Sequence, residues 1–397
     1  MLLLRPRTQT YPWGSKDLIA RLRGHTSASH PEAELWYGAH PGGSATVDNR
    51  TLTAVISADP EYHLGTSVRE KYGDRLPFLL KILAAAEPLS LQAHPSFAQA
   101  KEGFARENDA GIDIRAPHRN YKDDNHKPEL IVALTKFHAM AGFRPLSRTR
   151  ELFDALKCPT LDRWVGIAEG EGSEGDHLRA LFTTWISIPA TVRKELIDDI
   201  VDAARTVVAA GSEESDGTEP WIIETLSNII ELDSRYPGDV GVLGALLLNY
   251  VVIEPGEAVF LHAGNLHAYC KGLGVEIMAN SDNVLRGGLT SKHVDVPELV
   301  RVLDFRAVTD PRIESEGGWF RTPAEEFALA KVEVDGTTEV ICRGPRIALC
   351  TAGEISVAVG ESEVQLNPTQ AVWIAAGESE QITVSGRGQV FIATVNN

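Results

Sequence analysis

The sequence has only four cysteines in 397 residues, and no two of them are close together. Cys158, Cys270, Cys342 and Cys350 stand alone, without the Cys-x-x-Cys spacing of thiolate zinc sites. This scarcity argues against a framework of disulfide bonds and against a structural zinc ion held by cysteines. It is typical of a protein in a reducing compartment, so we expect a cytoplasmic protein.

Long hydrophobic runs are also missing. The apolar start at residues 1–4 is interrupted at once by Arg5 and Arg7. It therefore lacks the charged start and apolar length of a secretion signal. No later stretch approaches the roughly 20 apolar residues that cross a bilayer as a helix. We expect no membrane segment.

Positive charge is scarce as well. The chain carries 38 lysines and arginines against 55 aspartates and glutamates, which gives a formal net charge of −17 at pH 7. Nucleic acids and anionic membrane surfaces repel such an acidic chain, so neither is expected as a partner. Any group of lysines and arginines around a candidate site would therefore stand out from the background.

What the chain does contain is enough hydrophobic sequence for more than one core. With 397 residues, 43% of them hydrophobic, it is too long for a single ordinary core. Short apolar stretches separated by glycine and proline, such as residues 76–83, predict β-strands with a few helical pieces over residues 1–145. The strand pattern returns after Val251 and continues to the C-terminus, where residues 355–359 alternate cleanly.

A different period separates these two β regions. Within residues 146–248, apolar side chains recur at helical spacing, most clearly over residues 192–208. Pro189 precedes this run and Gly211 ends it, as helices prefer at their termini. The spacing therefore predicts a long helix.

A second helix is predicted over residues 221–232, after a polar loop at residues 212–217. Two helical patterns between two strand-rich regions indicate a helical insertion. The predicted fold class is thus mainly β with a helical insertion.

An internal repeat supports two β lobes, because residues 256–267 align with residues 369–380. The first copy fits the second cupin motif, G-x5-P-x-G-x2-H, with His262 in place of the proline. In the second copy Glu380 occupies the position of the motif's final histidine, and residues 316–397 contain no histidine at all. The pattern predicts a second lobe that has lost its metal. Chance similarity between two short segments is the alternative interpretation.

Four polar residues in three separate segments suggest a metal site. Gln92 and His94 are one residue apart, so both side chains point to the same face of a strand. Glu129 precedes the strand-like run 130–134, and a carboxylate in a β core is costly unless it is paired or metal-bound. His267 ends the first copy of the repeat. Alone, each has a simpler explanation, such as a polar strand edge or a histidine satisfied in the core. Together they form a plausible set of zinc ligands.

The same residues lie in segments that resemble the type I phosphomannose isomerases, a family of zinc enzymes of the cupin class. The similarity spans the catalytic part of the chain, whereas the insertion and the last lobe match mainly in arrangement. The resembling segments are Tyr11–Ser15, Ala33–Gly38, Leu76–Leu83, Pro88–Pro95, Asn125–Glu129, Phe143–Pro145, His267–Tyr269, Glu276 and Asn280–Lys292.

The resemblance implies two cupin-like jelly-roll lobes plus an α-helical domain. The expected catalytic lobe, with the zinc site, consists of residues 1–145 and 249–315. Residues 146–248 form the expected helical insertion, and residues 316–397 the second, metal-free lobe.

The resemblance also implies roles for individual residues. It implies one zinc ion per chain, with Gln92, His94, Glu129 and His267 as ligands, and Arg286 as the active-site arginine. The positions expected to line the substrate pocket are Trp13, His40, Lys81, Ser90, Lys127, Tyr269 and Lys292. Two residues depart from the family pattern: His262 replaces the usual proline, and Pro12 precedes the pocket tryptophan. Neither removes a ligand, and His262 lacks the cupin ligand spacing.

The expected activity is the interconversion of mannose 6-phosphate and fructose 6-phosphate. This aldose–ketose isomerisation moves a proton between C1 and C2 through an enediolate, whose oxyanion is best stabilised by a cation in a site shielded from water. Arg286, which is always charged, suits that task. Lys127 and Glu276 are both candidates for moving the proton. The sequence does not choose between them, and it does not identify the ring-opening group.

The phosphate of such a substrate needs cations. Arg286 and Lys292 lie in one short segment, Ser90 adds a hydroxyl near the proposed metal pair, and Lys81 is a further candidate. A solvated surface lysine is the simpler interpretation of Lys292. No glycine-rich phosphate loop is present, because Gly42 and Gly43 lack the required spacing.

Two other functions fit part of the pattern. A metal-dependent cupin oxygenase would share the barrel but favours a histidine-rich or two-histidine-one-carboxylate set, so Gln92 and the nearby cations argue against it. A non-catalytic sugar-binding bicupin fits the degenerate second lobe, but it would not need Glu129 beside Lys127. We expect a monomer whose partner is a small phosphorylated sugar.

Overall fold

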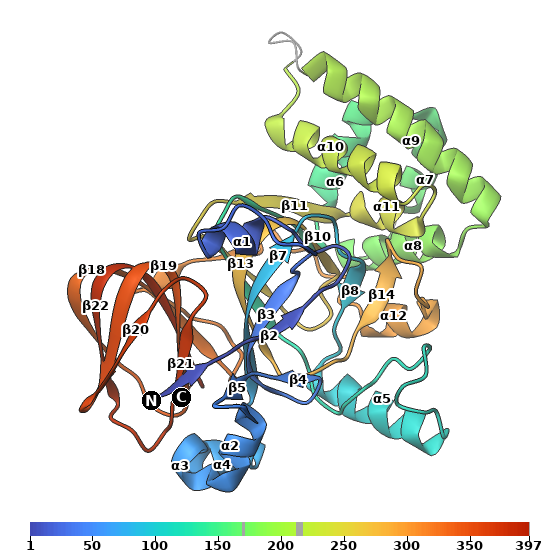
Figure 1. Cartoon of the computed structure of the whole chain (residues 1–397). Helices are drawn as coiled ribbons and strands as arrows, with labels where there is room; N and C mark the ends of the chain where they lie inside the picture. Colours follow the sequence, from blue (N-terminus) through green and yellow to red (C-terminus); the bar gives the residue numbers. More distant parts are fainter. Residues whose placement is uncertain (169–170, 212–216, 397) are drawn as a thin grey trace.

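The computed structural model describes residues 1–168, 171–211 and 217–396. Figure 1 shows a central β region, a group of helices on one side of it, and a C-terminal β region in orange and red. The two ends of the chain lie side by side (Figure 1). In the described part of the chain, no helix combines the length and the apolar character needed to cross a membrane.

The central region is built on a twelve-stranded sheet, in which the strand pairs are antiparallel. Its main path runs β15-β12-β9-β13-β7-β3-β2, and β8, β10, β11, β14 and β4 join it at the side. The bounds are β2 Arg7–Gln9, β3 Glu34–His40, β4 Gly43–Ser44, β7 Phe78–Ala85, β8 Leu91–Ala93, β9 Glu129–Ala133, β10 Phe137–Phe143, β11 Leu248–Ile253, β12 Ala258–Leu261, β13 His267–Ala279, β14 Leu285–Gly288 and β15 Arg312–Ile313. The predicted strand at 76–83 is β7, shifted by two residues.

Strand β13 holds this region together. Its first part pairs with β8 and β10, and its second part pairs with β7 and β9. One continuous strand therefore joins two groups of strands within the central sheet. His267 at its start and Glu276 further along line one cavity. Their odd separation would put them on opposite faces of a regular strand, but the register shift between Tyr269 and Lys271 adds one unpaired residue and restores a common face.

Small elements surround this sheet. The strands β5 Thr46–Val47 and β6 Arg50–Thr51 pair with each other. The helices are α1 Leu18–Leu22, α2 Leu52–Ala58, α3 Pro60–Leu64, α4 Thr66–Tyr72, α5 Phe97–Asp109 and α12 Val296–Val302. Helix α5 begins with a capping box, in which the Ser96 hydroxyl accepts from the Gln99 N–H and the Gln99 side chain accepts from the Ser96 N–H.

The helical region follows β10. Its helices are α6 Leu146–Leu156, α7 Pro159–Val165, α8 Glu174–Ser187, α9 Ala190–Gly211, α10 Pro220–Arg235 and α11 Val240–Ala245, with a 3-10 turn at Gly166–Ala168. The helices predicted at 192–208 and 221–232 lie within α9 and α10, so both predictions are confirmed. Of the polar loop predicted at 212–217, residues 212–216 lie outside the described residues.

These helices share a hydrophobic core with the sheet. Leu196 of α9 and Leu226 of α10 belong to the same buried cluster as Leu91 of β8 and Met140 of β10. The buried face of the helical region therefore supports the strands that carry Gln92 and the start of β13.

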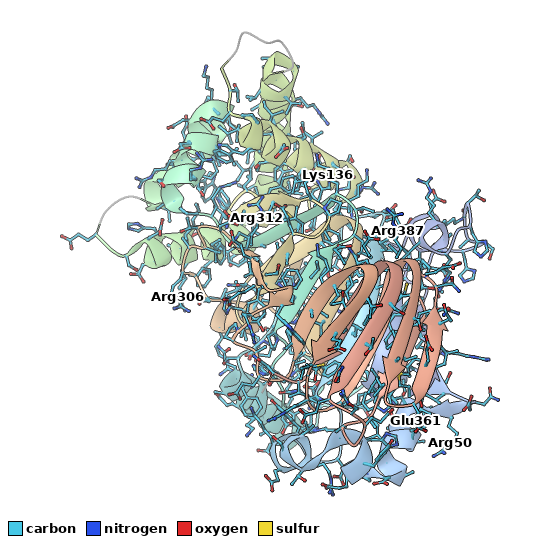
Figure 2. The ribbon with its side chains drawn as sticks, turned by 90° about the vertical axis from the view of Figure 1, so that its left-hand side faces the viewer. Arg50, Lys136, Arg306, Arg312, Glu361 and Arg387 are labelled. Carbon is cyan, nitrogen blue, oxygen red and sulfur yellow. The ribbon has the colours of Figure 1, made fainter. Side chains whose placement is uncertain are left out.

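The C-terminal sheet has the strand order β1-β21-β19-β22-β18-β17-β16, with β20 paired to β19. Its strands are β1 Leu2–Leu4, β16 Ser315–Glu316, β17 Trp319–Phe320, β18 Ala328–Ile341, β19 Arg346–Val359, β20 Ser362–Leu366, β21 Ala371–Ile374 and β22 Gln381–Thr394. The chain thus starts in this sheet, because β1 pairs with β21. Figure 2 shows the strands side by side, with Arg387 at one end of the sheet and Glu361 at the other.

The two β regions are packed against each other. Leu80 and Val275 of the central sheet lie in one buried cluster with Trp373 and Phe391 of the C-terminal sheet. Apolar burial of this kind is the main favourable term in folding. The C-terminal region therefore supports the back of the central sheet.

The repeated segments have matching backbone structure. Each contains a four-residue strand, β12 in the first copy and β21 in the second. Each strand is followed by a turn of the same type: the His262 N–H donates to the Asn265 side chain, and the equivalent Ala375 N–H donates to Glu378. The last residue differs, since Glu380 is half-exposed and pairs with Arg343 at 3.1 Å.

Candidate active site

Three buried side chains from three strands or strand ends converge on one point. His94 follows β8, Glu129 begins β9 and His267 begins β13. One ligand atom from each lies within 4.8 Å of the others, and all three residues are buried. His94 Nε2 is 3.4 Å from Glu129 Oε1, and His267 Nε2 is 3.3 Å from Glu129 Oε2.

Hydrogen bonds fix the orientation of both imidazoles. His94 Nδ1 donates to the Asn283 carbonyl oxygen at 2.7 Å, and His267 Nδ1 donates to the Asn265 carbonyl oxygen at 2.9 Å. With the proton held on Nδ1, the lone pair of each Nε2 points toward the carboxylate. Metal-binding histidines are usually oriented in this way. His94 Nε2 is buried and has no hydrogen-bond partner among the described residues, which is the arrangement that a metal ion would satisfy.

The protonation states also fit a metal ion. Burial lowers the pKa of His94 to about 4, so its imidazole is neutral near pH 7. Burial acts to raise the pKa of Glu129, but the charge of Lys127 and the contacts with His94 and His267 outweigh it and hold the pKa well below its usual range. An ionised carboxylate and a neutral imidazole are the forms that bind zinc.

Gln92 is the fourth residue expected at this point. It lies on β8, paired in register with His267 on one side and Arg286 on the other. Its amide nitrogen faces the Ser90 hydroxyl at 3.5 Å. The amide oxygen, which is the atom that zinc would take, is left without a partner among the hydrogen bonds of the described residues.

This group lies at a cavity of about 460 Å³. Twelve of the thirteen residues predicted for the site line it, and the remaining one, His94, is buried beside Glu129. The lining residues among those predicted are Trp13, His40, Lys81, Ser90, Gln92, Lys127, Glu129, His267, Tyr269, Glu276, Arg286 and Lys292.

Three cations surround the open part of the cavity. Lys127 Nζ lies 3.0 Å from Glu129 Oε1. Arg286 and Lys292 have no ion pair among the described residues, and Lys292 is exposed at the rim. Burial lowers the pKa of Arg286, and burial together with the charge of Arg286 lowers the pKa of Lys292. Two cations without a carboxylate partner are suited to an anionic ligand.

Where the central sheet lines the cavity, buried charges form a network across the three strands β3, β7 and β13. Lys81 of β7 is flanked in register by Trp36 of β3 and Glu276 of β13. Its ammonium lies 2.7 Å from Glu276 Oε2 and 3.6 Å from Glu34 Oε1. Glu34 also accepts a hydrogen bond from the Trp36 indole at 2.8 Å.

These contacts decide the charge of the network. Burial acts to lower the pKa of Lys81, but Glu276 and Glu34 outweigh it and raise the pKa above its usual value. Burial raises the pKa of Glu276, and the charge of Lys81 offsets this effect only in part. Lys81 is therefore held as a cation beside a carboxylate that takes up a proton more readily than usual.

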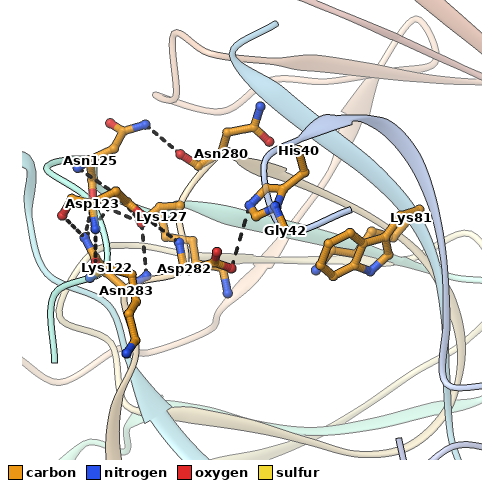
Figure 3. Close-up of polar contacts among 12 residues, drawn as sticks. His40, Gly42, Lys81, Lys122, Asp123, Asn125, Lys127, Asn280, Asp282 and Asn283 are labelled. Carbon is orange, nitrogen blue, oxygen red and sulfur yellow. Dashed lines mark hydrogen bonds and ion pairs between the residues drawn. The ribbon is translucent and has the colours of Figure 1, made fainter. Parts of the chain in front are cut away.

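His40 and Tyr269 complete the walls. His40 Nδ1 accepts the Gly42 N–H at 3.0 Å, so Nε2 carries the proton and faces Asp282 at 3.7 Å (Figure 3). Burial lowers the pKa of His40, against the opposing charge of Asp282. The Tyr269 hydroxyl is buried and has no hydrogen-bond partner among the described residues.

Some cavity residues were not predicted as site residues from the sequence. Glu34 and Trp36 lie on the same face of β3, and their spacing of two residues was the available signal. Asp282 belongs to a loop and gave no periodic signal. The two departures noted in the sequence lie outside the metal-binding group: His262 is exposed with its ring 4.7 Å from Phe260, and Pro12 is exposed.

Comparisons with known proteins agree with this geometry. Residues 1–146 match the family model of the phosphomannose isomerase type I catalytic domain. The chain is 39% identical to mannose-6-phosphate isomerase of Escherichia coli (strain K12), over 96% of each chain. It is 31% identical to mannose-6-phosphate isomerase 1 of Arabidopsis thaliana, over 99% of this chain and 94% of that protein. A solved structure of zinc-bound mannose 6-phosphate isomerase has a TM-score of 0.86 at 33% identity, covering 100% of this chain and 99% of the other.

The geometry predicts one zinc ion per chain, bound in the central β region. Changing Glu129 to Ala removes the one charged ligand atom and leaves two buried imidazoles facing each other, so purified protein should contain little zinc. Glu380→Ala, at the equivalent place in the second repeat, should keep its zinc. Elemental analysis tests both variants. Two zinc ions per parent chain, or zinc that persists after all four proposed ligands are changed to Ala, would contradict the prediction.

Proposed function

The chain belongs to the type I phosphomannose isomerase family, and from this premise we propose how its residues interconvert mannose 6-phosphate and fructose 6-phosphate. The protein is a zinc-dependent aldose–ketose isomerase. The observation that supports our assignment is the convergence of His94, Glu129 and His267 at the end of a cavity lined by Lys127 and Arg286. Neither an oxygenase nor a non-catalytic sugar-binding protein is favoured.

Gln92, His94, Glu129 and His267 are the proposed zinc ligands. Zinc bound by two imidazoles, an amide and one carboxylate keeps a net positive charge, and it supplies a Lewis acid that polarises a sugar oxygen. The protein's own contribution is to present the four ligand atoms from strands and a strand end, and to bury His94, Glu129 and His267 from water.

Arg286 is the proposed stabiliser of the enediolate. Its planar guanidinium lines the cavity, carries a permanent charge and is free of a carboxylate partner among the described residues. A preorganised donor placed where negative charge develops lowers the barrier more than one that must reorganise in water. This role needs the guanidinium rather than any cation, because its donors form a flat fork.

Glu276 and Lys127 are the proposed groups for moving the proton between C1 and C2. Burial raises the pKa of Glu276 toward the working range of a general base, and Lys81 at 2.7 Å keeps its carboxylate oriented. Lys127 lies 3.0 Å from Glu129, so its ammonium can donate to a substrate oxygen held near the zinc site. The remaining pocket residues, Trp13, His40 and Tyr269, are proposed to hold the sugar.

The phosphate is proposed to bind at the rim, to Lys292 with help from Ser90. Lys81 was a further candidate. Its ammonium already faces Glu276 and Glu34, so we assign it to orienting Glu276 and leave the phosphate to the rim.

The wider organisation is also part of the proposal. We assign the catalytic lobe to residues 1–145 and 249–315, apart from strand β1, which pairs into the C-terminal sheet. We assign the helical insertion to 146–248 and the metal-free lobe to 316–397. The active site is complete within one chain, which supports a monomer. A cytoplasmic location is supported by the four cysteines, all of them free and buried.

The function is tested by a coupled assay that converts mannose 6-phosphate to fructose 6-phosphate, with and without a chelator. We expect activity that is lost when the chelator removes zinc and restored when zinc is added, because the substrate oxygen needs the Lewis acid. Full activity in protein shown to be free of metal by elemental analysis would contradict the proposal.

Arg286→Lys should lower kcat about 10²-fold or more, because an ammonium cannot reproduce the flat pair of donors that faces the developing oxyanion. Zinc content and the midpoint of thermal unfolding should stay close to the parent values. Steady-state kinetics and elemental analysis test this together. A variant with nearly normal kcat would show that Arg286 is structural.

Lys292→Ala should raise KM for mannose 6-phosphate, because the phosphate loses a cation at the rim. Salt should also weaken the parent enzyme's apparent affinity by screening the same attraction. Unphosphorylated mannose should be a poor substrate and respond little to the change. Lys271→Ala removes an exposed lysine of β13 that is outside the cavity lining, and it serves as the control. An unchanged KM for the phosphosugar in Lys292→Ala would refute the assignment.

A further inference from the structure

Two loops that contain none of the proposed zinc ligands meet beside the His94 imidazole. One consists of residues 122–125 and the other of residues 280–283. Figure 3 shows their side chains and backbone groups joined by a dense set of hydrogen bonds. We call the pair of side chains at the centre of this set, Asp123 and Asn283, the clamp.

The Asn283 side chain uses its whole hydrogen-bonding capacity on the first loop. Its Oδ1 accepts the backbone N–H of Lys122 at 2.6 Å and that of Asp123 at 3.2 Å. Its Nδ2 donates to the carbonyl oxygens of Asp123 and Asn125, both at 2.8 Å. Asn283 is fully buried. A buried amide with all its partners in place fixes its surroundings, since an unmet donor or acceptor there is costly.

The Asp123 carboxylate in turn accepts hydrogen bonds from the second loop and from its own loop. Its Oδ1 accepts from the Ser281 hydroxyl at 2.8 Å and from the Asn125 N–H at 3.0 Å. Its Oδ2 accepts the Asp282 N–H at 2.7 Å. Each loop therefore holds the backbone of the other through one side chain, so neither can shift alone.

The clamp reaches the zinc site through one carbonyl group. The Asn283 carbonyl oxygen accepts the proton of His94 Nδ1 at 2.7 Å, and this bond determines the tautomer and the ring orientation of His94. The other proposed imidazole ligand does not depend on these loops, because His267 donates to the carbonyl of Asn265, two residues away on its own segment.

We infer that Asp123 and Asn283 are positioning residues that hold the His94 Nε2 lone pair toward Glu129 and thereby set how tightly the site retains zinc. This inference rests on the ligand set of the proposed function. It adds two residues that touch neither substrate nor metal, and it links the loop before Lys127 and Glu129 to the loop before Arg286.

The test measures the rate at which zinc passes from the intact protein to an excess of a chelating dye. Asn283→Asp replaces the Nδ2 donor by an oxygen that faces two carbonyl oxygens, and Asp123→Asn places an amide group where two backbone N–H donors and a hydroxyl converge. Both should speed zinc loss by about 10-fold or more, the lower end of the usual effect of disturbing an outer partner of a metal ligand.

A purely structural role is separated by a matched control. Asn249 also donates its Nδ2 to backbone carbonyl oxygens, including that of Val308 at 2.8 Å, and it lies outside the cavity lining. Asn249→Asp should lower the midpoint of thermal unfolding without speeding zinc loss. Clamp variants that lose thermal stability in the same way but release zinc at the parent rate would overturn the inference.

If Asn283→Asp or Asp123→Asn prevents folding, a milder variant still tests the inference. Ser281→Ala removes the hydroxyl that donates to Asp123 and leaves both clamp side chains in place. It should speed zinc loss by a smaller factor than the clamp variants, and a parent rate of zinc loss would count against the clamp. Parent protein that binds zinc but does not isomerise mannose 6-phosphate would refute the proposed function and leave this test valid.

Discussion

The structure depends most on the burial of the Glu129 carboxylate between two imidazoles. An ionised carboxylate is costly to remove from water unless charges and donors replace the water around it. Here Lys127 lies at 3.0 Å, and the Nε2 atoms of His94 and His267 lie at 3.4 and 3.3 Å. Both imidazoles hold their proton on the opposite nitrogen, so they offer the carboxylate lone pairs rather than positive charge. The space between Glu129, His94 and His267 therefore favours the binding of a cation.

The fold satisfies this requirement through strand register. Glu129 is the first residue of β9 and pairs with Met278 of β13, the strand that begins with His267. At the other end of β13, His267 pairs with Gln92 of β8. A slip of one residue in either pairing would turn the ligand side chains to the opposite face of the sheet. The apolar core that fixes the register, including residues of the helical region and of the C-terminal sheet, thus supports the site from a distance.

Sequence patterns could predict the parts of this site that lie on periodic elements. Gln92 and His94 share a strand face, the helices at 192–208 and 221–232 follow from apolar spacing, and the family resemblance supplied Arg286. Contacts between loops could not be predicted, because the bonds of Asn283 to residues 122–125 join backbone groups far apart in sequence and leave no periodic trace. The alternation at 355–359 also misled in part, since Ser356 is buried like its apolar neighbours. The sequence did not predict the pairing of β1 with β21, because three apolar residues do not specify which sheet they join.

The charges inside the cavity explain how an acidic protein can attract an anionic sugar. Three buried carboxylates, Glu34, Glu129 and Glu276, lie among two lysines, Lys81 and Lys127. This inner group has one negative charge in excess, which a divalent cation would turn into one positive charge. Arg286 and Lys292 add positive charge toward the rim without a carboxylate partner among the described residues, and Asp282, the acidic residue nearest to Arg286 in sequence, faces His40. The local field at the mouth is therefore opposite in sign to the net charge of −17. Because charges beyond about 10 Å are screened at ordinary salt, a substrate phosphate at the rim responds mainly to this local field.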